Sequence, residues 1–203
     1  MNRDHVLLLE RDCVYQGRFR VERYRLSYRL YDGRYSAELS REVFERGHVG
    51  AVLPVDPVRD AVVLIEQFRV GAYVAGWQPW LVECVAGIIE AGETSEELVR
   101  REAREEAGCV ITDLVPIMRF LTSPGACSET VALYCGRVDS AKVGGLHGLA
   151  AEGEDIRVLA LPIVQALEML EQGLIVNAKT IIALQWLERH YAGLKRHWLG
   201  EAD

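Results

Sequence analysis

The sequence has no long hydrophobic run, no paired-cysteine motif and no glycine-rich nucleotide-binding loop. Its strongly apolar stretches, such as 61–65, are much too short to span a bilayer. The short apolar run 6–9 is followed by Glu10, which does not resemble a signal peptide. No G-x-G-x-x-G motif follows a predicted strand and no Walker A loop occurs, which disfavours a doubly wound nucleotide-binding fold. We therefore expect a cytoplasmic protein that does not act at a membrane.

Metal-binding cysteine and histidine clusters are also missing. The five cysteines form no C-x-x-C pair, and the five histidines lie far apart from one another and from the cysteines. An odd number of cysteines without an export signal indicates free thiols in a reducing compartment. The wide spacing makes a zinc site improbable.

Charge is distributed unevenly along the chain. Residues 1–50 have a net charge of +2, whereas the remainder has a net charge of −9. An acidic main body argues against a general nucleic-acid-binding protein. It suits a site that holds divalent cations, because clustered carboxylates require a counter-charge.

The first 46 residues predict a small antiparallel β-sheet. Apolar residues alternate imperfectly with arginines over 19–30, Asp32-Gly33 is a hairpin turn signal, and 35–44 is the expected returning strand. A sheet this small is not stable alone and needs a neighbour to cover its apolar face. We expect it to pack on the main domain or on a second subunit.

From Gly47 onward the pattern predicts strands before and after one helix, then two further helices. Strands are expected at 49–55, 61–69, 80–86, 110–121, 130–138 and 156–161. Helices are expected at 95–107, ended by Gly108, at 163–172, and at 178–197 behind an Asn177 cap, with a long loop over 139–155. This order predicts an α/β fold, a mixed sheet with helices on both faces.

The most informative stretch is 87–109, in which a glycine-rich loop leads into a helix with three glutamates. Glu102, Glu105 and Glu106 are three and four residues apart, so they share one helical face. Like charges in this arrangement destabilise a helix unless they are neutralised. Neighbouring arginines neutralise part of the charge, and Mg²⁺, which prefers carboxylate oxygens, is the stronger candidate. By itself, the glutamate pattern also fits a solvated charged helix.

The same stretch resembles the signature of the Nudix hydrolases, G-x5-E-x7-R-E-U-x-E-E-x-G-U, in which U is usually bulky and aliphatic. All seven defined positions agree: Gly87, Glu93, Arg101, Glu102, Glu105, Glu106 and Gly108. Ala103 and Cys109 occupy U positions and are small, but both are apolar enough to face a core. The resemblance implies the Nudix α/β/α sandwich with a mixed sheet, plus a small N-terminal antiparallel β-sheet domain.

Stretches outside this signature resemble the bacterial ADP-ribose-hydrolysing branch of the same family. They are 41–48, 62–67, 123–125, 148–150, 152, 154–157 and 183–187. Pro124 lies sixteen residues after Gly108, a spacing that the family associates with ADP-ribose as the substrate. The resemblance covers nearly the whole chain and implies two domains, a dimerisation sheet at 1–46 and a hydrolase domain at 47–203.

The resemblance also assigns roles to the acidic residues. It implies that two or three Mg²⁺ ions, or Mn²⁺, are bound by Glu102, Glu106, Glu154 and the backbone oxygen of Ala86. Glu152 would be the general base that activates water, in a loop that closes over bound substrate; without the resemblance, this loop would be interpreted as flexible and acidic. Glu105 would support the metal site, as a further ligand or as a base, and Arg101 would orient the glutamates by charge-assisted hydrogen bonds.

Substrate-binding residues are implied in the same way. Arginine forms bidentate contacts with phosphate oxygens, so Arg41, Arg46 and Arg69 are candidates for binding the diphosphate and neighbouring groups. Phe19 either stacks on adenine or lies in the core of the small sheet, and Glu42 would accept a hydrogen bond from the adenine amino group. The remaining candidates, some from the loop expected at the terminal ribose, are Arg18, Ile88, Ser123, Pro124, Gly125 and Glu129.

These assignments predict Mg²⁺-dependent hydrolysis of ADP-ribose to AMP and ribose 5-phosphate. The family's N-terminal sheet exchanges between subunits, which implies a domain-swapped homodimer with a small-molecule nucleotide-sugar substrate and no nucleic-acid or membrane partner. Two alternatives remain: another ADP-sugar or GDP-sugar as substrate, and a non-catalytic nucleotide-sugar sensor. A sensor would predict an eroded signature and usually an added DNA-binding segment, whereas the signature here is intact.

Overall fold

Two separate β-sheets organise the chain, as described by a computed structural model of residues 1–149, 151 and 153–201. Contacts between residues divide the chain into two compact units. The first unit contains 1–48 together with 121–130, and the second contains 49–120 and 131–203.

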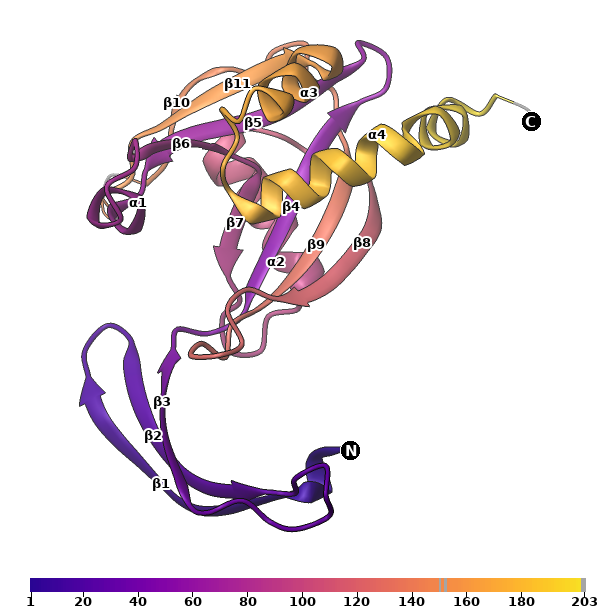
Figure 1. Ribbon diagram of the computed structural model, residues 1–203. Helices are drawn as coiled ribbons and strands as arrows, with labels where there is room; N and C mark the ends of the chain where they lie inside the picture. Colours follow the sequence, from indigo (N-terminus) through magenta and orange to yellow (C-terminus); the bar gives the residue numbers. More distant parts are fainter. Residues whose placement is uncertain (150, 152, 202–203) are drawn as a thin grey trace. The chain divides into compact units, whose positions relative to one another are not determined.

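The first unit is a three-stranded antiparallel sheet preceded by a short 3₁₀ helix, η1 (Arg3–His5) (Figure 1). Its strands are β1 (Val6–Gln16), β2 (Arg20–Tyr28) and β3 (Leu39–Glu45), in the order β1-β2-β3. The sequence pattern does not predict β1, and the strand expected from residue 35 begins only at Leu39, since Tyr35 forms an isolated bridge with Arg29. The turn at Gly33 is present, with a φ of 90°.

The second unit contains an eight-stranded mixed sheet. Its strands are β4 (Val49–Asp56), β5 (Ala61–Phe68), β6 (Trp80–Glu83), β7 (Val85–Ile88), β8 (Asp113–Leu121), β9 (Thr130–Arg137), β10 (Gly145–His147) and β11 (Ile156–Pro162). The order is β10-β11-β5-β4-β9-β8, with β6 paired to β5 and β7 paired to β4. Because β4 runs parallel to β9 and antiparallel to β5 and β7, the predicted mixed sheet is confirmed.

Three details of the second unit differ from the sequence prediction. The single strand expected at 80–86 is two strands, because the chain leaves β5 after Glu83 and pairs with β4 from Val85 onward. The loop expected at 139–155 contains the short strand β10, which pairs with β11. A short helix, α1 (Val70–Val74), occupies a stretch for which no element was predicted.

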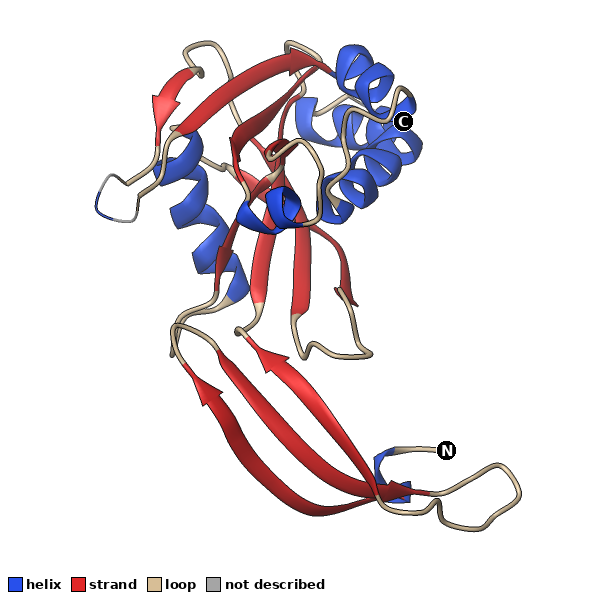
Figure 2. Ribbon diagram, turned by 60° about the vertical axis from the view of Figure 1, so that its left-hand side comes forward, coloured by secondary structure: helices blue, strands red, loops and turns tan. Residues whose placement is uncertain are grey.

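Helices cover both faces of the sheet, as predicted (Figure 2). Helix α2 (Ser95–Ala107) packs on one face, and helices α3 (Ile163–Glu171) and α4 (Ala178–Leu199) pack on the other. Alternate residues of the central strands point to opposite faces of the sheet. Val52 of β4 lies in the hydrophobic cluster that includes α2, and Leu53 lies in the cluster that includes α4. Both faces of β4 are therefore buried, which explains its nearly continuous apolar sequence.

The structure also describes the cysteines and the length and apolar character of the helices. All five cysteines are free thiols, as expected. In the described part of the chain, no helix has both the length and the apolar character that crossing a membrane requires.

Candidate active site

Helix α2 carries the glutamate cluster, and local hydrogen bonds define both of its ends. Thr94 Oγ1 accepts a hydrogen bond from the Glu97 amide at 3.2 Å, and Glu97 Oε2 accepts one from the Thr94 amide at 2.9 Å. This reciprocal capping box satisfies amide groups that the first turn of a helix leaves unpaired. At the other end, Gly108 has a φ of 62°, a left-handed conformation that glycine adopts without strain.

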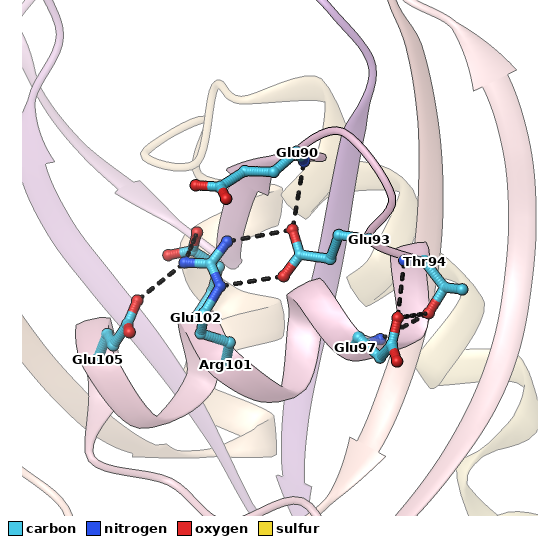
Figure 3. Close-up of polar contacts among 7 residues, drawn as sticks. All are labelled: Glu90, Glu93, Thr94, Glu97, Arg101, Glu102 and Glu105. Carbon is cyan, nitrogen blue, oxygen red and sulfur yellow. Dashed lines mark hydrogen bonds and ion pairs between the residues drawn. The ribbon is translucent and has the colours of Figure 1, made fainter.

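Arg101 connects this helix to the loop that precedes it (Figure 3). Its Nε donates to Glu93 Oε1 at 3.0 Å, and its Nη1 donates to Glu102 Oε1 and to Glu105 Oε2, each at 2.9 Å. Glu93 Oε2 also accepts from the Glu90 amide at 3.3 Å. The hydrogen bonds from Arg101 lower the pKa of Glu93, so the loop and the helix are joined by charge-assisted bonds.

Glu106 is a buried carboxylate, and it lies near the partly buried carboxylate of Glu102, which repels it. Glu106 is only 3% exposed, and burial, followed by repulsion from Glu102, raises its pKa to about 8. Burial also raises the pKa of Glu102, although the positive charge of Arg101 acts in the opposite direction. A buried carboxylate close to a partly buried one is costly unless a cation neutralises them.

The strand β7 fits closely against these two glutamates. The Ala86 amide donates to Glu106 Oε2 at 3.3 Å. Gly87 lies beneath Glu102, and a Cβ at this position would overlap the Glu102 side chain. A glycine here lets the Glu102 carboxylate approach the backbone next to Ala86, whose carbonyl oxygen is a candidate metal ligand.

Glu154 is the third carboxylate near this pair. Its negative charge adds to the repulsion felt by both Glu102 and Glu106. Its Oε2 accepts a hydrogen bond from the Leu149 amide at 3.1 Å. Glu152, the expected base, lies outside the described residues.

The donor set suits a divalent cation that is ligated by hard oxygens. Among the described residues, no three His, Cys, Asp or Glu side chains form a complete metal cage by themselves. Mg²⁺ does not need such a cage, since it usually keeps several waters and takes only one or two carboxylates. The burial of Glu106 and the mutual repulsion of Glu102, Glu106 and Glu154 fit a bound cation.

Glu105 differs from its two neighbours on the helix. Its side chain is 35% exposed and forms an ion pair with Arg101 four residues earlier. The structure therefore places Glu105 at the accessible side of the cluster and Glu106 at its buried side.

Arg69 follows β5 and has a buried partner that the sequence analysis missed. Its Nε donates to Glu83 Oε2 at 2.8 Å, and Glu83 is 1% exposed. The positive charge of Arg69 opposes part of the rise in the pKa of Glu106, so the guanidinium lies near enough to the carboxylate cluster to interact with it. A glutamate within the apolar stretch 80–86 was the only sequence signal for this pair.

Several other candidates gather in the first unit around Phe19. The guanidinium carbons of Arg18 and Arg46 each lie 5.8 Å from the centre of the Phe19 ring, and Phe44 contacts it edge-on at 5.4 Å. Arg46 Nη1 also forms an ion pair of 2.8 Å with Glu129, which is buried. Phe19 is half-buried and one of its contacts is aromatic, so it contributes to the packing of this unit.

The remaining candidates are more exposed. Arg41 and Glu42 lie on β3 and are exposed, and Arg41 Nη1 donates to the Ser40 carbonyl oxygen. The exposed segment 123–125 belongs to the first unit and turns tightly, with the Ser123 carbonyl oxygen accepting from the amides of residues 126 and 127. Ile88 ends β7 in the second unit and pairs with Val49 of β4.

Comparison with known proteins agrees with this fold and this helix. The NUDIX domain family matches residues 45–184, more than half of the chain, and the chain belongs to this family. The chain is 48% identical to the ADP-ribose pyrophosphatase of Escherichia coli over 196 residues, which is 97% of this chain and 94% of that protein. It is 38% identical to the ADP-ribose pyrophosphatase of Haemophilus influenzae, over 94% of this chain and 89% of that protein.

A solved structure supports the fold independently. The crystal structure of an ADP compounds hydrolase superposes with a TM-score of 0.71 and covers 94% of this chain and 96% of that one. The two sequences are only 22% identical, so this likeness concerns the fold alone.

Proposed function

We propose that this protein hydrolyses the diphosphate bond of ADP-ribose to AMP and ribose 5-phosphate with the help of Mg²⁺. The observation that carries the proposal is the group of mutually repelling carboxylates formed by Glu154 with Glu102 and Glu106 of the intact Nudix signature helix. The substrate is supported by relatives named ADP-ribose pyrophosphatase that align over nearly the whole chain.

Residues of the second unit would bind the metal ions and hold the metal ligands in place. Glu102, Glu106, Glu154 and the backbone oxygen of Ala86 would hold two or three ions, Mg²⁺ or Mn²⁺. When bound, a divalent cation would offset the negative charge of the diphosphate oxygens. Arg101 keeps the signature helix and its preceding loop together, so that the carboxylates are held in place before substrate binds.

Proton transfer and substrate positioning belong to other side chains. We assign Glu152 as the base that removes a proton from the attacking water, and Glu105 to a supporting role beside Arg101. Arg69 would bind a diphosphate oxygen, because its guanidinium lies near the carboxylate cluster. From the first unit, we assign Arg18, Phe19, Arg41, Glu42, Arg46, Ser123, Pro124, Gly125 and Glu129 to substrate binding, and from the second unit Ile88.

A product assay on a panel of substrates tests this function. ADP-ribose, another ADP-sugar, a GDP-sugar and NADH would be incubated with the protein in Mg²⁺, in Mn²⁺ and in excess EDTA. We expect AMP and ribose 5-phosphate from ADP-ribose, in a reaction that EDTA abolishes and added Mg²⁺ restores. A clear preference for the GDP-sugar would contradict the substrate, and binding of ADP-ribose without any turnover would indicate a sensor.

We also propose that the protein is a homodimer whose N-terminal sheets are exchanged between copies. Strand β1 exposes four consecutive apolar side chains: Val6, Leu7, Leu8 and Leu9 are each 46–58% exposed. A three-stranded sheet with an uncovered apolar surface needs a further partner to be stable. The resemblance to the family supplies the identity of that partner, a second copy of the chain in the cytoplasm.

Light scattering of the full-length protein after size-exclusion chromatography tests the dimer. We expect twice the 22.8 kDa mass of one chain for the wild type, and a shift toward the monomer for Leu8→Glu, which places a charge on the exposed apolar run. A wild-type monomer with full activity on ADP-ribose would contradict the exchanged dimer.

A further inference from the structure

A buried carboxylate with polar partners on both oxygens lies outside the signature helix. Glu83, the last residue of β6, is 1% exposed, although a lone buried carboxylate is strongly unfavourable. Its Oε2 accepts from Arg69 Nε at 2.8 Å and pairs with Arg69 Nη2 at 2.6 Å. Its Oε1 accepts from Asn177 Nδ2 at 2.5 Å, so both oxygens have a partner.

The contacts of Glu83 leave one edge of the Arg69 guanidinium available. A guanidinium has five N–H groups in a fixed planar fork. Glu83 takes the edge formed by Nε and Nη2, which leaves the edge formed by Nη1 and the second hydrogen of Nη2. Among the described residues, Glu83 is the only hydrogen-bond or ion-pair partner found for the Arg69 side chain, which is 36% exposed. The remaining edge has the geometry that binds two phosphate oxygens at once.

The segment that carries Glu83 is itself fixed by helix α4. Asn177 caps this helix, since its Oδ1 accepts from the amides of Lys179 at 3.1 Å and Thr180 at 3.4 Å. The Thr180 hydroxyl in turn accepts from the amide of Cys84, next to Glu83, at 2.9 Å. The start of α4 therefore holds two consecutive residues, one through its backbone and one through its side chain.

We propose that Glu83 is a positioning residue, which fixes the Arg69 guanidinium so that its free edge faces the diphosphate of the substrate, and that Asn177 holds Glu83 in place. This inference rests on the proposed role of Arg69 in binding the substrate. If Glu83 and Asn177 act in this way, residues on both faces of the sheet contribute to the reaction. The signature helix lies on one face, and the N-terminus of α4 lies on the other.

A double-mutant cycle in the full-length protein tests this inference. Glu83→Gln keeps the shape of the side chain and removes the charge that Arg69 pairs with. Misplacing a binding group by about 1 Å can reduce catalysis on the order of 10²-fold, so we expect kcat/KM for ADP-ribose to fall by about 10- to 100-fold. In an Arg69→Ala background, the same substitution should change kcat/KM by less than about twofold, because groups that act through one another are not additive.

A matched control variant distinguishes an effect of Glu83 on the position of Arg69 from an effect on the stability of the protein. Asp60→Asn weakens the contacts of Asp60 with Tyr191 and Lys195 near the other end of α4, and it does not involve Arg69. Asparagine tolerates the positive φ of 51° at this position. We expect Asp60→Asn to lower the melting temperature and to leave kcat and KM unchanged, whereas Glu83→Gln should change both the melting temperature and kcat/KM.

Three outcomes would overturn the proposal. They are an equal loss from Glu83→Gln in both backgrounds, no loss in the wild-type background, and no loss on Arg69→Ala. If Glu83→Gln does not fold, Asn177→Ser provides the same cycle, since serine caps a helix about as well as asparagine but is too short to reach Glu83. A wild-type protein that does not cleave ADP-ribose would refute the proposed substrate only, and the cycle would then be measured with the nucleoside diphosphate sugar that it does cleave.

Discussion

Gly87→Ala is the substitution that tests the position of Glu102 most directly. Gly87 lies in β7 and does not have a positive φ, so its backbone conformation is open to alanine. A Cβ there would lie 2.6 Å from Cδ and 2.8 Å from Cγ of Glu102, whereas ordinary contacts are 3.4–4 Å. Glu102 Oε1 would lie closer still, so the carboxylate would have to retreat from Gly87 by about 1 Å.

This displacement sets the expected size of the effect. Because a misplacement of about 1 Å can cost on the order of 10²-fold in rate, we expect Gly87→Ala to lower kcat/KM by about 10- to 100-fold. We also expect the concentration of Mg²⁺ that gives half-maximal activity to rise. The added methyl group should reduce the free energy of unfolding by about 1–3 kcal/mol, the usual cost of overpacking.

Steady-state kinetics over a Mg²⁺ titration, with thermal unfolding of the same samples, measures both quantities. Gly193→Ala in α4 is the matched control, because a Cβ there meets nothing within 4 Å. It should raise stability by about 0.5–1 kcal/mol and leave activity unchanged. In a Glu102→Ala background, Gly87→Ala should have no further effect on activity. A Gly87→Ala variant with wild-type kcat/KM and Mg²⁺ dependence would refute the position assigned to Glu102.

Three further predictions concern single side chains. Glu106→Gln removes a ligand charge but keeps the shape, so turnover should fall on the order of 10²-fold or more; near-normal turnover in saturating Mg²⁺ would contradict this. Glu152→Gln should lower the single-turnover rate by about 10²–10⁴-fold, while ADP-ribose binding measured by calorimetry stays nearly intact. Glu105→Gln should lower the single-turnover rate by a smaller factor. A larger loss of rate from Glu105→Gln than from Glu152→Gln would assign the base to Glu105. Asp56→Asn should reduce the free energy of unfolding by about 1–3 kcal/mol at pH 7, because buried Asp56 accepts hydrogen bonds from Ser140.

The acid dependence of this last effect has a definite sign. Burial alone would raise the pKa of Asp56, but hydrogen bonds from Ser140 and Arg59 outweigh burial and lower its pKa. A lowered pKa contributes stability above the unfolded value of about 3.9 and loses it as the pH falls toward the folded value. The difference in unfolding free energy between the wild type and Asp56→Asn should therefore shrink below about pH 4. A difference that stays constant down to pH 2 would contradict the assignment.

Local signals made α2 predictable from the sequence. The helix was expected at 95–107, and the structure has Ser95–Ala107, because the end signal at Gly108 and the apolar face depend only on nearby residues. The cap at Asn177 was predicted for the same reason, and its hydrogen bonds to the start of α4 confirm it. The glutamate face and its arginine also follow from helical spacing alone.

Features that depend on distant partners were not predictable in the same way. The division of 80–86 into two strands depends on the pairing of one half with β5 and of the other with β4. Strand β1 was missed because nearly all of its residues are exposed, which removes the alternation that marks a half-buried strand. Glu83 was missed because its partners, Arg69 and Asn177, are 14 and 94 residues away along the chain.

We propose that the carboxylate cluster on α2 serves the hydrolysis of ADP-ribose. The most direct test is phosphorus NMR of ADP-ribose with the wild-type protein and with Glu106→Gln, at equal protein concentration in saturating Mg²⁺ and again in EDTA. We expect the diphosphate resonances of ADP-ribose to be replaced by two phosphomonoester resonances, from AMP and ribose 5-phosphate, only with the wild type in Mg²⁺. Persistence of the diphosphate resonances with the wild type in Mg²⁺, or their loss at the wild-type rate with Glu106→Gln, would contradict it.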